Sequence, residues 1–238
     1  MSENIGKIIV LDIETAPDPY LLSFAPSRLS KDHPSLHAVT GYSILAAEED
    51  QNGDWSVTDL ASPQNTDEYE ILFELDEMVT PAIEQEATLV TYNGISHDVL
   101  MIQRRMGAHM LYALPSQSGL ARMKHRDMMR EVSTGPRNWP SLQQLCAIYS
   151  IPSNHLLIPS RGPIAPTHER KSQVDVIATY LILAHRLAGE RGSSAVVGKA
   201  WLALASFLND KGKVNPHLAQ FLDKDLLARA RAQLGDEG

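Results

Sequence analysis

The feature that most restricts the fold is a short apolar run near the N-terminus. Residues 8–11 read Ile-Ile-Val-Leu and predict a buried strand over residues 7–12. The strand ends in acidic residues, because the apolar run is followed by Asp12, Ile13 and Glu14. On an extended backbone, side chains two positions apart face the same side, so the two carboxylates should lie together. A hard divalent cation with oxygen ligands would relieve their repulsion. Taken alone, the pair is equally compatible with a solvated strand end.

The remaining pattern predicts an α/β chain. Further strands are indicated at residues 36–47, 55–60, 87–92 and, more weakly, 124–129. Apolar spacings of three and four indicate helices at residues 69–83, 96–106, 142–149, 172–187, 194–208 and 218–234. Pro81 should end or kink the first helix near Thr80. Segments rich in Pro and Ser, at residues 17–34 and 153–167, are expected to be irregular. This order implies a mixed sheet flanked by helices.

Three acidic motifs occur in an order that resembles the DEDD superfamily of 3′–5′ exonucleases. The strand-end motif of residues 8–15 resembles the first family motif, Asp-x-Glu-Thr. Residues 91–98 resemble the second, in which a strand and an Asn-Gly turn lead to a helix-borne acid, here Asp98. Residues 171–180 resemble the third, with Asp175 as the acid. Connecting segments with family-like sequences lie at residues 125–127, 141–145 and 151–152, so the resemblance covers residues 7–187.

The resemblance implies a ribonuclease H-like fold, a mixed sheet flanked by helices, with extra C-terminal helices. The similarity is greatest to proofreading or predicted DNA-polymerase-associated exonucleases. Such a domain would occupy residues 1–190, and residues 191–238 would form a helical extension. The implied activity is hydrolysis of the terminal phosphodiester bond at the 3′ end of single-stranded DNA or RNA, with two Mg²⁺ or Mn²⁺ ions.

The resemblance also assigns roles to individual residues. Asp12 would bridge both ions, Glu14 and Asp175 would complete one site, and Asp98 would support the other, partly through water. The backbone and side chains expected to face the terminal nucleotide are those of Thr15, Tyr92, Asn93 and Gly94.

The sequence departs from the family where the attacking water is oriented. The family has a Tyr four positions before the last Asp or a His five positions before it, but Lys171 and Arg170 occupy these places. His97 also stands where relatives usually have an aromatic residue. Lys171 could replace the Tyr after losing its proton by desolvation, or His168 could serve as the base. In a third interpretation, the chain is a catalytically impaired module that binds nucleic acid or a partner.

The amino-acid composition limits which binding partners and which cellular compartment are expected. A net charge of −8 argues against a protein that holds nucleic acid on a broad basic surface, although a carboxylate cluster that binds cations contributes to this total. The acidity also suggests a rival, a metal hydrolase acting on small nucleotides. A single cysteine, Cys146, fits a reducing compartment, and no apolar run reaches the length of a membrane span. Cytoplasmic location without membrane insertion is therefore expected.

Other conspicuous residues have less specific interpretations. The aromatic residues expected to lie in the core are Trp139, Trp201, Phe207 and Phe221. A basic group that could contact phosphate, or could equally be solvated surface, comprises Arg104, Arg105, Arg122, Lys124, Arg126 and Arg130. The C-terminal helices could pack on the domain, form a dimer or dock a protein partner, and the sequence leaves these roles open.

Overall fold

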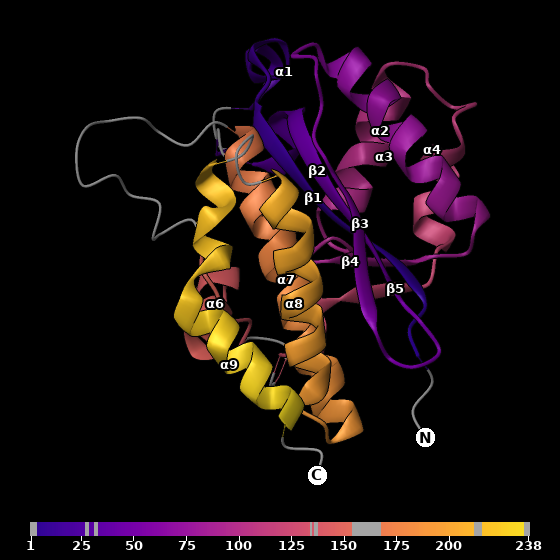
Figure 1. Ribbon diagram of the computed structural model, residues 1–238. Coiled ribbons are helices and arrows are strands. Elements are labelled where there is room, and N and C mark those ends of the chain that lie inside the picture. The colour runs from indigo at the N-terminus through magenta and orange to yellow at the C-terminus, as the bar shows by residue number, and fades with distance from the viewer. Residues whose placement is uncertain are drawn as a thin grey trace.

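Five strands form one twisted sheet at the centre of the molecule (Figure 1). The computed structural model describes residues 4–26, 29–30, 33–133, 135, 138–153, 168–211 and 216–235, except for the side chains at positions 168, 210 and 211. The strands are, in spatial order, β3 (Trp55–Ala61), β2 (His37–Glu49), β1 (Lys7–Pro17), β4 (Thr88–Thr91) and β5 (His125–Asp127).

The sheet is mixed. β1 pairs antiparallel with β2 from Lys7–Glu48 to Pro17–His37, with a register shift after Glu14. β2 and β3 are also antiparallel, whereas β4 is parallel to both β1 and β5. Three antiparallel strands followed by two parallel ones, in the order 3-2-1-4-5, are the arrangement of a ribonuclease H-like fold. The expected fold class is thereby confirmed.

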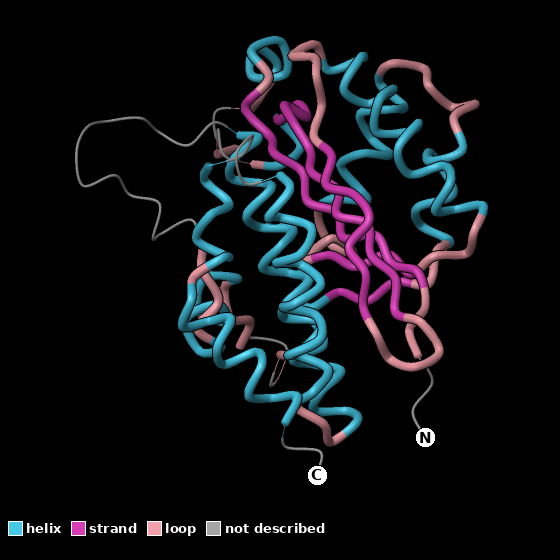
Figure 2. Tube along the Cα trace, viewed as in Figure 1, coloured by secondary structure: helices cyan, strands magenta, loops and turns pink. Residues whose placement is uncertain are grey.

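Helices cover both faces of the sheet (Figure 2). One face carries α2 (Glu68–Glu84), α3 (Asp98–Ala108) and α4 (Pro115–Gly119). The other face carries α6 (Leu142–Tyr149), α7 (His168–Arg191), α8 (Ala195–Lys211) and α9 (Lys224–Gly235). Short helical turns complete the chain at α1 (Pro19–Phe24), η1 (Pro34–Leu36), η2 (Leu120–Arg122), α5 (Met128–Glu131) and η4 (Pro216–Leu222). No described helix is long and apolar enough to cross a membrane.

Both faces of β1 are buried, which explains its nearly continuous apolar sequence. Ile9, Leu11 and Ile13 belong to the hydrophobic cluster shared with α2 and α3. Ile8 and Val10 point the other way and belong to the cluster shared with α7 and α8. The central strand therefore joins the two layers, and its side-chain alternation decides which layer each later residue faces.

Two helix boundaries differ from the sequence expectations. Pro81 does not end α2 at Thr80, because it lies in the last turn and the helix continues to Glu84. The helix expected over residues 218–234 is divided into η4 and α9. Asp223 separates them, and its carboxylate accepts the N–H of Asp225 at 2.9 Å, as an N-cap does.

The two segments expected to be irregular have different outcomes. Residues 17–34 contain the single turn α1, whose N-cap Asp18 accepts the N–H of Tyr20 at 2.9 Å. The loop expected over residues 153–167 lies outside the described residues except for Ser153.

The C-terminal helices extend the core on the α7 face. Trp201 and Phe221 are buried there, with ring centroids 6.3 Å apart. At the end of α7, Arg191 donates to the buried carboxylate of Glu49 on β2, with Nη2 2.8 Å from Oε2. The proposed boundary near residue 190 stays a prediction.

Candidate metal centre

The alternation of β1 carries two carboxylates to the α7 face. Asp12 and Glu14 follow Ile8 and Val10 on the same side of the strand, where the apolar core ends. Asp175, on α7, meets them there, and oxygens of the three side chains all lie within 4.8 Å of one another. The strand and the helix therefore bring together three of the four acids expected to bind metal.

Lys171 lies one helical turn before Asp175 and points into the same cluster. Its Nζ is 2.5 Å from Glu14 Oε1 and 3.3 Å from Asp175 Oδ2. The start of α7 is fixed against the sheet because the buried hydroxyl of Ser172 lies 2.8 Å from that of Ser43 on β2. Ser43 is the register partner of Asp12, so this contact holds the helix directly beside the strand end.

Asp98 is the first residue of α3 and is 4% exposed. His97 Nδ1 lies 2.9 Å from its Oδ1, and this hydrogen bond raises the pKa of His97 above its usual value. Asp98 stands outside the three-residue group described above. It is nevertheless the charged neighbour that most strongly raises the pKa of Asp12.

The electrostatics of the centre favour a bound cation. Burial, followed by the charges of Asp98 and Asp175, holds the pKa of Asp12 well above its usual range. Burial also raises the pKa of Asp98, against the opposing effect of His97. Among the described residues, neither Asp12 Oδ2 nor Asp98 Oδ2 has a hydrogen-bond partner, although both atoms are buried. Carboxylate oxygens in this state suit Mg²⁺ or Mn²⁺, so the donor set fits the expected ions.

A tight turn between β4 and α3 positions Asp98. Asn93 adopts a left-handed conformation with φ of 72°, and the N–H of Gly94 donates to Thr91 Oγ1 at 3.0 Å. A Cβ atom at Gly94 would lie 2.5 Å from Thr91 Cβ, so only glycine fits this close approach.

Asp127 stabilises the same turn and was not assigned a role from the sequence. Its two carboxylate oxygens accept the backbone N–H groups of Asn93 at 2.9 Å and Ile95 at 3.1 Å. Asp127 is 2% exposed and is the last residue of β5, where it pairs with Thr91 of β4. The signal was present in the family-like segment of residues 125–127, but spacing alone cannot reveal which backbone groups a distant carboxylate will accept.

Comparisons with known proteins concern the overall arrangement. The sequence matches no protein-family model and no curated protein. In solved structures, the chain is similar to a family B DNA polymerase from the archaeon Pyrobaculum calidifontis, with 12% identity and a TM-score of 0.45 over 82% of this chain and 26% of that chain. It is also similar to E. coli exonuclease I in complex with a dT13 oligonucleotide, with 11% identity and a TM-score of 0.39 over 77% and 41%.

A second structure of exonuclease I gives 12% identity and a TM-score of 0.41, over 77% of this chain and 40% of that chain. This chain therefore spans well under half the length of each of these proteins.

The residues expected to face a nucleotide have partners within the fold. Thr15 Oγ1 lies 3.1 Å from His37 Nδ1. The hydroxyl of Tyr92 donates to the carbonyl of Pro140, and burial raises the pKa of this phenol. Tyr92 thereby ties the segment before α6 to the end of β4.

The charge state of Lys171 differs from the sequence expectation. Burial lowers the pKa of this lysine, as that argument assumed, but the carboxylates of Asp175 and Glu14 outweigh burial and raise the pKa above its usual value. The ion-free centre therefore contains an ammonium group rather than a neutral amine. The side chain of His168, the alternative base, lies outside the described part of the chain.

Arg105 and Arg126, two of the six residues in the expected basic group, form ion pairs within the fold. Arg105 donates to Glu68 at 2.8 Å, and Arg126 donates to Glu131 and Glu190 at 2.9 and 2.7 Å. Only some members therefore remain available as phosphate contacts.

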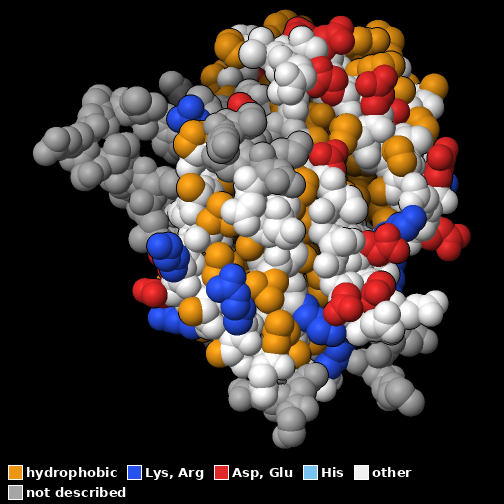
Figure 3. Space-filling view, viewed as in Figure 1, with side chains coloured by type: hydrophobic (Ala, Val, Ile, Leu, Met, Phe, Trp, Pro, Cys, Tyr) orange, Lys and Arg blue, Asp and Glu red, His pale blue; other side chains and the backbone are white. Residues whose placement is uncertain are grey.

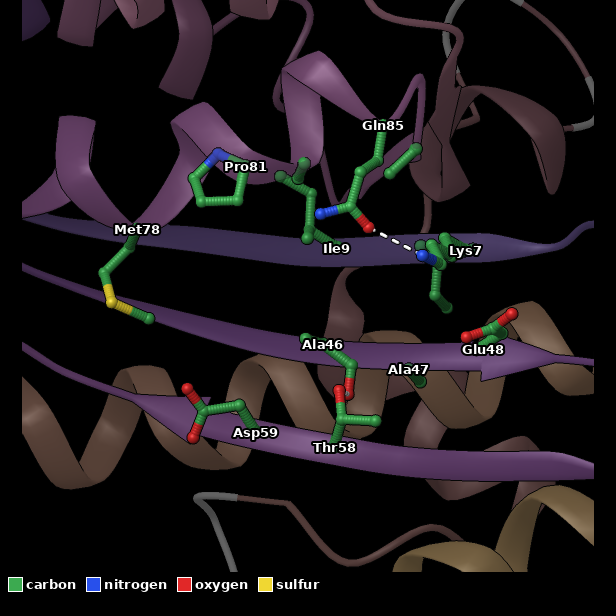
Figure 4. Close-up of a pocket in the computed structure, with 13 residues that line it drawn as sticks. Lys7, Ile9, Ala46, Ala47, Glu48, Thr58, Asp59, Met78, Pro81 and Gln85 are labelled. Carbon is green, nitrogen blue, oxygen red and sulfur yellow. Dashed lines mark hydrogen bonds between the residues drawn. The ribbon is translucent and has the colours of Figure 1, made fainter.

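A cavity of about 310 Å³ lies away from the acids, between the start of β1 and the end of α2 (Figure 4). Lys7 Nζ donates to Gln85 Oε1 at 2.6 Å across its rim. Ile9 also lines it, five residues and roughly 17 Å along the strand from Glu14. This cavity is therefore separate from the candidate metal centre.

Proposed function

We propose that this chain is a metal-dependent 3′–5′ exonuclease that hydrolyses terminal phosphodiester bonds of single-stranded nucleic acid. The observation that carries the proposal is the meeting of Asp12, Glu14 and Asp175, with the unpartnered buried oxygens of Asp12 and Asp98, at one end of β1. Buried acids without partners lower stability, so their retention at one point favours a functional explanation.

The four acids would hold Mg²⁺ or Mn²⁺, as the resemblance implies. A bound divalent ion would supply positive charge to the scissile phosphate and to the oxygens that attack it and leave it. The protein itself would hold the four carboxylates in position around the ion. Asp12 and Glu14 are fixed by β1, Asp175 by α7, and Asp98 by the turn that Asp127 stabilises.

The surroundings of the centre suit a terminal nucleotide. Thr15 continues β1 beyond Glu14, and Asn93 and Gly94 lie in the turn that leads from β4 to Asp98 at the start of α3. We assign these residues, together with Tyr92, to contacts with the last base and sugar.

An exposed aromatic residue supports single-stranded nucleic acid as the substrate. Trp139 is 43% exposed, which corrects the expectation that it lies in the core. It lines a shallow pocket together with Arg130, whose Nη2 donates to Ser96 Oγ at 2.8 Å beside the turn. A tryptophan face that stacks on a base, next to a guanidinium that contacts phosphate, is a typical means of holding a single strand.

The acidic residues are unevenly distributed over the protein, so the negative net charge does not argue against a nucleic-acid substrate. α2 contains six acidic residues and no Lys or Arg, whereas α9 contains Lys224, Arg229 and Arg231. Figure 3 shows acidic side chains predominating over the α2 side of this face and basic ones toward α8 and α9. The net charge of −8 therefore does not describe every surface.

The decisive experiment follows a 5′-labelled single-stranded oligonucleotide incubated with the full chain and Mg²⁺ or Mn²⁺. We expect a ladder that shortens from the 3′ end, lost in Asp12→Ala and retained in Asp225→Asn, which changes an exposed acid on α9. Cleavage that survives Asp12→Ala would place the chemistry elsewhere. Activity on free nucleotides with none on oligonucleotides would favour the small-nucleotide hydrolase.

One observation favours a second candidate, a catalytically impaired module that binds nucleic acid or a partner. Lys171 occupies the position of the family's tyrosine and forms ion pairs with Glu14 and Asp175. Oligonucleotide binding by folded protein, without cleavage in either metal, would support this candidate over the exonuclease.

A further inference from the structure

We infer that the ammonium group of Lys171 permanently replaces one divalent ion, so that the centre binds a single divalent ion between Asp12 and Asp98. The inference rests on the metal centre of the proposed function, but it departs from the two-ion arrangement that the resemblance implies. It also assigns the lysine a task other than that of a base.

The first observation is where the ammonium group lies. Nζ is 2.5 Å from Glu14 Oε1 and 3.3 Å from Asp175 Oδ2, which are the two acids expected to complete one ion site. Mg²⁺ would require oxygens at about 2.0–2.1 Å, so an ion bound by these same atoms would be in close contact with Nζ. Like charges at such a separation repel strongly in a partly buried site.

The second observation is which oxygens remain unsatisfied. Glu14 and Asp175 already have Lys171 as a partner. In contrast, Asp12 Oδ2 and Asp98 Oδ2 are both buried without a hydrogen-bond partner among the described residues. His97 contacts the other oxygen of Asp98, Oδ1, and so leaves Oδ2 for an ion. The oxygens left for an ion are therefore different from those that Lys171 contacts.

The third observation is that the lysine is well placed by its helix. Lys171 and Asp175 are four residues apart on α7 and therefore face the same side. The two residues after Lys171 hold this turn of the helix in place. Ser172 contacts Ser43 at 2.8 Å, and Gln173 Nε2 donates to Ser62 Oγ at 3.0 Å. The lysine side chain is 45% exposed, and its head is directed at the acids.

The ammonium group and one divalent ion would place three positive charges against the four carboxylates, which leaves a net charge of −1. The ammonium group stands against Glu14 and Asp175, and one divalent ion would stand against Asp12 and Asp98. Two divalent ions together with the ammonium would place five positive charges against these four carboxylates. A second ion would therefore change the net charge of the centre from −1 to +1.

The test is the number of Mn²⁺ ions bound by the full chain without substrate, measured by isothermal titration calorimetry and by electron paramagnetic resonance of the bound ion. We expect one ion in the wild type and in Lys171→Arg, which keeps the charge. Lys171→Met keeps the stem and removes the charge, and we expect it to bind two. Lys199→Met, which removes a lysine paired with Asp54 far from the acids, should still bind one.

The position of the ion is tested by two further variants. Asp98→Asn should weaken binding of the single Mn²⁺ by roughly tenfold or more, as loss of a partner does in metal sites. Asp175→Asn should weaken it less, because Asp175 faces the ammonium group. The opposite ranking, with Asp175→Asn causing the larger loss, would overturn the inference.

The number of Mn²⁺ ions bound by the wild-type protein is itself a test, even if Lys171→Met does not fold. Two ions in the wild type would mean that the lysine moves aside, and would overturn the inference while leaving the exonuclease intact. No bound ion in any folded variant would instead remove the metal centre itself, and the proposed function with it.

Discussion

The carboxylate of Asp127 accepts the backbone N–H of Asn93 at 2.9 Å, across 34 residues of sequence. Its second oxygen accepts the N–H of Ile95 at 3.1 Å, so one buried side chain satisfies two donors of the turn before α3. This turn fixes the position of Asp98 relative to the other acids of the candidate metal centre. Asp127 is therefore a positioning residue, with no contact to the expected ions required.

Asp127→Asn tests this role. An asparagine offers one acceptor oxygen in place of two, so one buried N–H loses its partner and the free energy of unfolding should fall by about 1–3 kcal/mol. Urea unfolding measures the loss, and Mn²⁺ titration should show weaker binding. The control is Asp76→Ala, which leaves the N–H of Ser116 in the α2–α4 layer without the carboxylate oxygen that accepts it at 2.8 Å. The control should lose similar stability and keep its metal affinity; equal losses of metal affinity would contradict the positioning role.

Gly94→Ala tests the close approach within the same turn. The added Cβ would meet Thr91 Cβ at 2.5 Å, and Thr91 is held in β4, so we expect a loss of about 1–3 kcal/mol. Gly189→Ala is the matched control because Gly189 is exposed on α7 with nothing within 4 Å of the new atom. That variant should gain roughly 0.5–1 kcal/mol from helix propensity. Thermal denaturation of both measures the contrast, and an undisturbed Gly94→Ala protein would show that the turn can relax.

Asp12→Asn should make the ion-free protein more stable at neutral pH. The pKa of Asp12 is raised in the folded state, chiefly by burial and then by Asp98, so ionisation of this acid disfavours folding. A gain of about 1 kcal/mol would raise Tm by roughly 2–4 °C for a chain of this size. Differential scanning calorimetry in a chelator measures the shift. Addition of Mn²⁺ should raise Tm of the wild type and have less effect on the variant.

The pH dependence of this difference has a definite sign. A raised folded-state pKa means that the folded protein holds its proton to higher pH than the unfolded chain, so this group's contribution becomes less favourable as pH rises from about 4. The stability advantage of Asp12→Asn should accordingly shrink on acidification toward that value. An advantage that is independent of pH would show that the acid is not penalised in the folded state.

Trp139→Ala should weaken binding of a single-stranded oligonucleotide by about 1–3 kcal/mol, the usual contribution of one stacked base. Fluorescence anisotropy in a chelator measures affinity without cleavage. Tyr112→Ala removes another exposed aromatic residue, 67% exposed and following α3, and should leave affinity unchanged. Equal effects of the two variants would indicate that Trp139 does not belong to the substrate surface.

The sequence alone predicted the helices and strands in which buried and exposed side chains alternate with a regular period. The apolar run of β1, the Asn-Gly turn before β3 and the amphipathic pattern of α2 each depend on neighbours a few positions apart, and local alternation makes those visible. The same alternation placed Asp12 and Glu14 on one side of their strand. The resemblance added Asp98 and Asp175 in the correct order.

Only the tertiary structure decided how these acids are partnered. Glu14 and Lys171 are 157 residues apart, and nothing in their local sequence reports that α7 crosses the end of β1. The role of Asp127 was missed and the exposure of Trp139 was predicted wrongly for the same reason, because a buried hydrogen bond and an exposed ring depend on which segments become neighbours. The sequence determines each element through short-range patterns, whereas charge, pKa and exposure in the centre are set by long-range packing between elements.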